Sequence, residues 1–263
     1  MKRSWMLLAL LATGPVLAED ATPNPEAQKL MQCMRANVPA QMTIGSLELT
    51  AFDRSGGSRT LKGRLYGRKA DKGLIHASMH LDAPTELKGA SYLVMETEDY
   101  LRDGMFVYLP SVKRVRRITG TFADASLMGT NFSYFEFKQL ENAFGDLRPA
   151  LEGTEPVNER PTQVMSFAAL PGAETKYTKV KAWIDQQACV VVQAEFYEDQ
   201  KLSKQLSSPK GSLRQAGPVW YVSEYEMRDP GSGTHTLLRI GKVNTDKKAP
   251  DGYFDPNRFF LAP

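Results

Sequence analysis

The amino-acid sequence predicts a mainly β protein (α+β) in which two helices accompany a large antiparallel sheet. Between residues 43 and 240 the chain contains ten short runs rich in β-branched and aromatic residues, joined by turn residues such as those at 53–57 and 69–73. Several of these runs alternate apolar and polar side chains with the period of two that a half-buried strand requires. Two other segments combine a helix start with apolar side chains at helical spacing.

The first predicted helix begins at Asn24, whose side chain is suited to cap it, and Pro25 follows as a residue that needs no intrahelical donor. An apolar stripe runs from Leu30 to Val38, and Pro39 ends the helical pattern. We expect this stripe to lie on the sheet.

The predicted strands are 43–52, 59–68, 73–81, 91–98 and 105–109, followed by 164–170, 177–184, 190–197, 219–227 and 234–240. In 190–197, Val190, Val192, Ala194 and Phe196 share one apolar face, whereas the run 105–109 is apolar on both faces. The second pattern indicates a strand with core on one side and a helix or a cavity on the other. A curled sheet with helices across its concave face fits both patterns, and the space between holds either packed side chains or a ligand.

The second predicted helix, 134–144, has a strongly specified start. Ser133 and Glu136 have the spacing of a capping box, in which each residue bonds the backbone N–H of the other. Phe132 and Phe137 occupy the two positions of a hydrophobic staple, and Gly145 ends the helix.

The loop at 120–129 precedes this helix and is bounded by glycines. It carries Phe122, Leu127 and Met128 among small residues. Such a loop either closes over a lipid chain as a lid or tucks onto the core as an ordinary connection, and the sequence leaves both alternatives open.

The N-terminus is predicted to be an export signal. Lys2 and Arg3 precede an apolar stretch at 5–13, and the small-residue site at 16–18 indicates cleavage near Ala18. No later stretch approaches the roughly 20 apolar residues that span a bilayer. We therefore expect residues 1–18 to be removed, leaving a single domain at 19–263 in the periplasm.

Cys33 and Cys189 are the two cysteines of the chain. In an exported protein an even pair favours a disulfide, which here would join the first helix to a distant strand. The alternative is two buried free thiols, because the sequence does not show whether the two Cα atoms come within bridging distance.

The run 108–118 concentrates Lys113, Arg114, Arg116 and Arg117 without an acidic residue. Strand alternation places these cations on both faces of the sheet. They form either a solvated edge strand, protected from aggregation by its charge, or a docking surface for an anionic lipid headgroup or an acidic patch on a transporter.

The residues do not favour an enzyme. His76 and His80 lie roughly 13 Å apart along a predicted strand at about 3.3 Å per residue, too far to share a metal ion, and His235 stands alone in another strand. The G-x-S-x-G and H-E-x-x-H patterns are absent from the sequence. We expect no catalysis, no cofactor and no metal site. Loss of Lys2 and Arg3 brings the formal charge of +3 close to neutral, so nucleic-acid binding is not expected.

Five motifs together resemble a known family. They are Y-L-P-S-V-K-R-V-R-R-I at 108–118, G-T-N-F-S-Y at 129–134, W-Y-V-S-E-Y-E-M-R-D at 220–229, G-T-H-T-L-L-R at 233–239 and F-D-P-N-R-F at 254–259. They are similar to the outer-membrane lipoprotein-sorting-like proteins related to LolA and LolB. The resemblance implies an incomplete antiparallel β-barrel of about eleven strands, with helices covering the concave apolar face around a cavity for acyl chains. Asn131 stands where the family commonly has aspartate, and the chain lacks the N-terminal lipid-anchoring cysteine of LolB.

The resemblance implies a monomeric periplasmic carrier for a lipid or an acylated protein, working beside an inner-membrane exporter of the hydrophobe-transporting kind. The alternative is a sensor or adaptor of the same fold that regulates a membrane partner. The residues expected to line the cavity or its lid are Phe106, Tyr108, Phe122, Leu127, Met128, Phe132 and Tyr134.

Overall fold

The computed structural model describes residues 24–142, 144, 147–173 and 175–261, and the predicted export signal lies outside these residues. The described chain forms two α-helices, α1 (Pro25–Ala36) and α2 (Tyr134–Asn142), and sixteen strands. The strands before α2 are β1 (Gln41–Phe52), β2 (Ser58–Lys69), β3 (Ile75–Ala83), β4 (Ser91–Met95), β5 (Gly104–Leu109) and β6 (Arg114–Ile118). Those after it are β7 (Leu147–Val157), β8 (Arg160–Ala169), β9 (Lys179–Asp185), β10 (Val191–Glu198), β11 (Lys201–Ser207), β12 (Leu213–Ala216), β13 (Val219–Val222), β14 (Glu224–Asp229), β15 (Thr234–Ile240) and β16 (Val243–Asn244).

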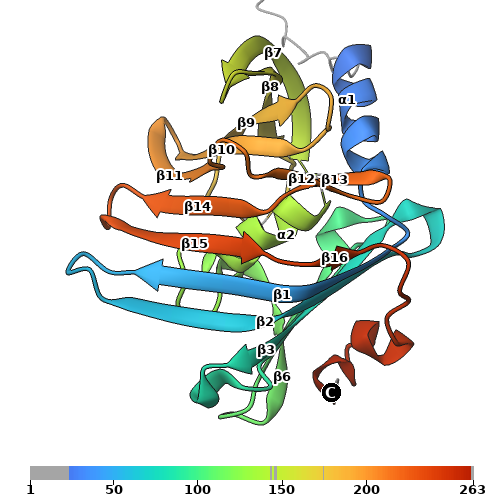
Figure 1. Ribbon diagram of the computed structural model, residues 1–263, viewed down its shortest axis with the longest axis vertical. Coiled ribbons are helices and arrows are strands. Elements are labelled where there is room, and N and C mark those ends of the chain that lie inside the picture. Colours follow the sequence, from blue (N-terminus) through green and yellow to red (C-terminus); the bar gives the residue numbers. More distant parts are fainter. Residues whose placement is uncertain (1–23, 143, 145–146, 174, 262–263) are drawn as a thin grey trace, which may run out of the picture.

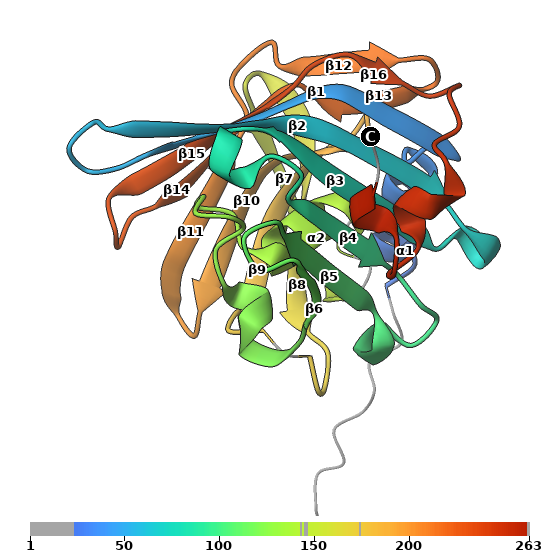
Figure 2. The ribbon, with the colours of Figure 1, turned by 90° about the horizontal axis from the view of Figure 1, so that it is seen from below.

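Most strands join one curved antiparallel sheet (Figures 1 and 2). Its order is β6-β5-β4-β3-β2-β1-β15-β14-β11-β10-β9-β8-β7, with β16 paired to β1 as the fourteenth strand. The first and last strands of this order, β6 and β7, are not paired with each other in the described sheet, so the sheet is open. The mainly β, antiparallel prediction is confirmed. The strand count exceeds the expected eleven.

Some of the additional strands lack the sequence pattern that is typical of a strand. β7 contains Pro149, Gly153 and Pro156, residues that are depleted in strand interiors but tolerated at a sheet edge, where β7 lies. The run predicted as one strand at 219–227 is divided at Ser223. Its N–H donates to the carbonyl of Ser212 (2.8 Å), and the chain before it leaves the main sheet to form the separate β12–β13 hairpin.

The predicted start of α1 is confirmed. The Asn24 side chain accepts hydrogen bonds from the backbone N–H groups of Glu26 (2.8 Å) and Ala27 (3.4 Å), and Pro25 occupies the first turn. Met34 is buried, with Leu30 and Met31 packed partly buried against the main core. Among the described residues no helix has the length and apolar character needed to cross a membrane.

The predicted start of α2 is confirmed as well. The N–H of Ser133 donates to Glu136 Oε2 (2.7 Å), and the N–H of Glu136 donates to Ser133 Oγ (3.1 Å). The rings of Phe132 and Phe137 meet edge to face with centroids 6.4 Å apart, as a staple requires. The Tyr92 hydroxyl of β4 donates to the carbonyl of Tyr134 (3.0 Å), which fixes α2 to the first half of the sheet.

The C-terminal segment covers the outer face of the first strands. Its short 3-10 helices η5 (Asp251–Phe254) and η6 (Phe259–Leu261) pack on an aromatic cluster, in which Tyr66 meets Tyr253 and Tyr108 stacks on Phe260 with ring centroids 4.3 Å apart. The two apolar faces of 105–109 are thereby explained, because Val107 joins the main core while Tyr108 lies under η6.

Candidate functional site

A cavity of about 190 Å³ lies where α1, α2, β1 and the β12–β13 hairpin meet. Its lining is almost wholly apolar, and the rim residues are partly exposed, so that the cavity reaches the surface beside α1 and the hairpin. The lining residues are Met34, Asn37, Val38, Pro39, Met42, Ile44, Leu47, Leu65, Phe137, Leu140, Phe144, Cys189, Val190, Val191, Val219, Trp220, Tyr221, Val222, Tyr225, Leu238, Ile240 and Val243.

Strand alternation and the end of α1 give this cavity its apolar surface. Met42 and Ile44 of β1 face it, whereas the intervening Thr43 does not line it. Met34 lines it from α1, and Val38 and Pro39 line it from the segment that follows the helix. The cavity can hold apolar groups and offers few partners to polar ones.

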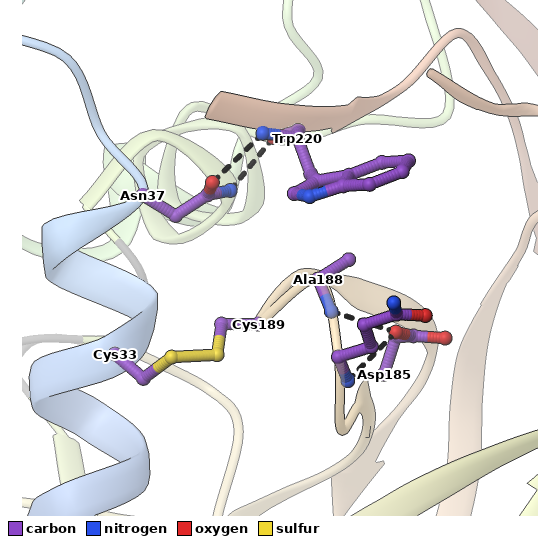
Figure 3. Close-up of a disulfide and its surroundings, with 7 residues drawn as sticks. Cys33, Asn37, Asp185, Ala188, Cys189 and Trp220 are labelled. Carbon is purple, nitrogen blue, oxygen red and sulfur yellow. Dashed lines mark hydrogen bonds between the residues drawn. A yellow bond between two sulfur atoms is a disulfide. The ribbon is translucent and has the colours of Figure 1, made fainter. Parts of the chain in front are cut away.

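The β12–β13 hairpin covers one side of the cavity and is tied to α1 by a paired amide contact. The Asn37 side-chain amide donates to the carbonyl of Trp220 (2.7 Å), and its oxygen accepts from the N–H of Trp220 (2.8 Å) (Figure 3). All four residues of β13 line the cavity, and the hairpin has no pairing with the main sheet among the described strands. Hydrogen bonds to α1, and not strand pairing with the main sheet, therefore hold the hairpin over the cavity.

The predicted disulfide between Cys33 and Cys189 is confirmed, with the two Cα atoms 5.7 Å apart (Figure 3). It joins α1 to the turn between β9 and β10 across a sequence separation of 156. Asp185 holds that turn, because its carboxylate accepts from the N–H groups of Ala188 (2.8 Å) and Gln187 (3.1 Å). One wall of the cavity is therefore covalently fixed, while the hairpin is held by hydrogen bonds.

The residues expected from sequence to bind the ligand do not line this cavity. Leu127, Met128, Phe132 and Tyr134 are buried in the main core, and Phe106 and Tyr108 face the aromatic cluster under the C-terminal segment. Phe122 is 70% exposed in the 3-10 helix η4 (Gly120–Asp124). A ligand role for these residues stays a prediction.

Sequence reasoning missed most of the cavity residues, although two patterns pointed to them. The run 219–222, Val-Trp-Tyr-Val, is apolar or aromatic at every position, which is unusual for an exposed hairpin. The apolar stripe of α1 was recognised but assigned only to packing. Asn37, Trp220 and Cys189 come together from three distant parts of the chain, and no local pattern indicates such a meeting.

A buried polar network lies beside the cavity under α2. Glu136 is fully buried and accepts from the Lys204 ammonium of β11 (2.9 Å) and from the Tyr177 hydroxyl. Lys204 also donates to the carbonyl of Asn131 (2.7 Å). Burial, and then the Glu136 carboxylate, raise the pKa of the Tyr177 hydroxyl. The network connects α2 to the second half of the sheet and to the loop that precedes the helix.

The predicted basic run forms the turn before β6 and most of β6 itself. Lys113, Arg114, Arg116 and Arg117 are exposed. Arg114 and Arg116 share a face with Ile118, which joins the main core, whereas Val115 and Arg117 lie on the face of the aromatic cluster. The cations therefore occupy both sides of the sheet, at the edge that lies opposite β7 in the sheet order.

The histidines occupy structural surroundings. His80 of β3 is 4% exposed, with its ring nitrogens 2.8 Å from Ser78 Oγ and 3.2 Å from Ser91 Oγ. Burial, aided by Arg64 and opposed by Asp82, lowers the pKa of His80 to about 4. In the ranges that the structure describes, no group of three or more His, Cys, Asp or Glu side chains is placed to hold a metal ion.

The low pKa of His80 predicts an acid sensitivity of the fold. The unfolded chain binds a proton at His80 as the pH falls below 6.5, while the folded chain does so near pH 4. The free energy of unfolding should therefore decrease by about 3 kcal/mol between pH 6.5 and 4 through this residue. Denaturant unfolding at several pH values should show a shallower dependence for His80→Gln. The control variant His235→Gln, in a partly exposed part of β15, should keep the wild-type dependence, and equal slopes for all three proteins would contradict this role of His80.

Comparison with known proteins places this geometry in a family. A family model described as an uncharacterized protein matches residues 75–259, which is more than half of the chain. No curated protein matches the sequence. A solved structure of a DUF1329 family protein from Desulfovibrio piger is 23% identical, with a TM-score of 0.80, and the match covers 89% of this chain and 97% of that one.

Two further solved structures share the fold. A putative outer membrane lipoprotein-sorting protein domain from Vibrio parahaemolyticus is 20% identical, with a TM-score of 0.80 over 89% of this chain and 98% of that one. A LolA superfamily protein from Nitrosomonas europaea is 15% identical, with a TM-score of 0.67 over 87% of this chain and 97% of that one. The chain belongs to the family of uncharacterized proteins that the model defines, and it has the fold of these lipoprotein-sorting and LolA superfamily structures.

Proposed function

We propose that this protein is a periplasmic carrier that binds the acyl chain of a lipid or an acylated protein in the apolar cavity beside α1. The observation that carries the proposal is the apolar lining of a cavity that reaches the surface under a hydrogen-bonded hairpin. The Cys33–Cys189 disulfide agrees with an oxidising compartment. The shared fold of a protein described as lipoprotein-sorting adds support by analogy.

The size of the cavity indicates how cargo would enter. At about 190 Å³ it is smaller than the roughly 300–1,000 Å³ of typical small-molecule pockets. It holds part of an acyl chain as it stands, and a whole chain requires the β12–β13 hairpin to move. That movement breaks the two hydrogen bonds between Asn37 and Trp220 while the disulfide keeps α1 attached. Binding in such a cavity involves no covalent chemistry, so the cargo can be released again. It would pass to or from an inner-membrane exporter.

A cavity-filling variant tests the carrier function. Val243 lies on β16 at the cavity and is partly exposed, so Val243→Trp should fill the cavity with little damage to the fold. We expect binding of a fluorescent palmitate probe, measured by titration, to weaken by at least about tenfold, because the probe loses contact with apolar surface.

The matched control is Val157→Trp, which changes a partly exposed valine at the end of β7, outside the cavity. It should bind the probe like the wild type. Thermal unfolding of both variants shows whether the fold is intact. Failure of the wild-type protein to bind the probe, or equal binding by both folded tryptophan variants, would overturn the proposal for this cavity.

A further inference from the structure

The strand β6 is an edge whose charges are not balanced within the described chain. β6 has one strand neighbour, β5, and begins the sheet order (Figure 2). None of the ion pairs between described residues involves Lys113, Arg114 or Arg116. Arg117 donates to the backbone carbonyl of Arg102 (3.3 Å). The strand therefore carries exposed positive charge on both sides of the sheet at its edge.

The acidic residues Asp99, Asp103 and Asp124, in the chain segments that adjoin β5 and β6, are paired with other groups. Asp99 is bound to Arg102 (3.2 Å), and Asp103 is bound to the buried Lys138 (2.8 Å). Asp124 of η4 accepts from the Thr175 hydroxyl (3.1 Å) and from the N–H of Lys176 (2.7 Å). Local acids therefore leave the positive potential of β6 uncompensated, and it can attract an external anionic surface.

Large apolar side chains are exposed in the segments that adjoin this edge. Four such residues are exposed in the described chain, and three of them belong to these segments: Leu101 (55%), Val112 (40%) and Phe122 (70%). Val112 directly precedes Lys113 in the turn before β6. Leu101 adjoins Arg102, whose backbone carbonyl accepts a hydrogen bond from the Arg117 side chain. Phe122 follows β6 by a few residues in η4. Cations and apolar side chains thus occupy the same edge.

We infer that the β6 edge, with Leu101, Val112 and Phe122, docks the protein on the surface of an anionic lipid bilayer. Lys and Arg side chains then lie among the headgroups, and the apolar side chains enter the boundary of the acyl region. Edge protection against aggregation explains the cations but gives no reason for exposed apolar residues beside them. An acidic protein segment would match the charges, and vesicle binding distinguishes it from a bilayer.

Vesicle co-sedimentation of the full chain without its predicted export signal tests this inference. Vesicles of phosphatidylcholine alone should bind weakly, and vesicles in which a third of the lipid is phosphatidylglycerol should bind strongly at low ionic strength and less at physiological ionic strength. The double variant Arg114→Gln, Arg116→Gln should partition about 25-fold more weakly, since each cation near an anionic surface contributes about fivefold. Phe122→Ser should also weaken binding.

A matched control separates this edge from general charge. Lys247→Gln with Lys248→Gln removes two exposed cations that follow β16. This variant should bind like the wild type within about twofold, because exposed charges outside the proposed surface contribute little. Loss of binding equal to that of the β6 variants would overturn the inference. So would absence of binding to anionic vesicles, or arginine-dependent binding of soluble polyglutamate without vesicle binding, which would indicate an acidic protein partner. Palmitate binding by the β6 variants should be unchanged, so the two proposals fail independently.

Discussion

Replacement of Lys204 by alanine is expected to lower the free energy of unfolding by about 3–5 kcal/mol, because it leaves the fully buried Glu136 carboxylate without its cation. Denaturant unfolding followed by circular dichroism measures this change. Lys201→Ala is the matched control, as it alters an exposed lysine on the same strand, and it should change stability by less than about 0.5 kcal/mol. A loss below about 1 kcal/mol for Lys204→Ala would show that the pair contributes little.

A double variant distinguishes the lost ion pair from lost packing. Lys204→Met keeps an apolar stem but leaves Glu136 unpaired, whereas Lys204→Met with Glu136→Gln has neither buried charge, so the double variant should be more stable than Lys204→Met alone. The side-chain amide that replaces the Glu136 carboxylate still has an oxygen, which can accept from the Tyr177 hydroxyl or from the Ser133 N–H. Stability of Lys204→Met close to that of the wild type, together with a low stability of Lys204→Ala, would assign the effect to packing of the lysine stem instead.

The contacts of Glu136 show which interactions can be predicted from the sequence and which cannot. The capping box of Ser133 and Glu136 was predictable, since its two residues are three apart and its geometry is local. The same Glu136 side chain has Tyr177 and Lys204 as partners 41 and 68 residues away, and nothing in the local pattern marks them. The sequence therefore predicts the local contact that starts the helix, whereas the distant contacts of Glu136 appear only in the folded structure.

The strands and the cavity also differ in how well the sequence predicts them. Alternation predicted ten strands because each alternates or is apolar over a short run, but it failed for β7, whose prolines and glycine resemble a loop. The cavity is built from elements distributed along the whole chain, and its lining residues look like ordinary core residues in the sequence. The sequence leaves the loop before α2 as either a lid or an ordinary connection on the core; in the structure Leu127 and Met128 are buried, and the cover of the cavity is a hairpin much later in the chain.

The disulfide is expected to contribute about 2–5 kcal/mol to stability, as it closes a long loop between Cys33 and Cys189. Replacing both cysteines by serine should lower the denaturation midpoint of the protein by a corresponding amount in the absence of reductant. The wild type should lose the same stability when reductant is added, whereas the serine variant should not respond to reductant. A wild type and a variant of equal stability would contradict a structural role for the bridge.

In the proposed carrier, the disulfide leaves the hairpin as the wall of the cavity that opens. Without it, α1 remains attached through the Asn37–Trp220 contact and through the ion pair between Arg35 and Glu96 (2.9 Å), both of which are non-covalent. Amide hydrogen exchange in α1 should therefore accelerate in the serine variant to rates closer to those of the β12–β13 hairpin. In the oxidised protein the hairpin should exchange faster than α1, because the hairpin is the wall without a covalent link. Faster exchange in α1 than in the hairpin of the oxidised protein would place the opening at the helix instead.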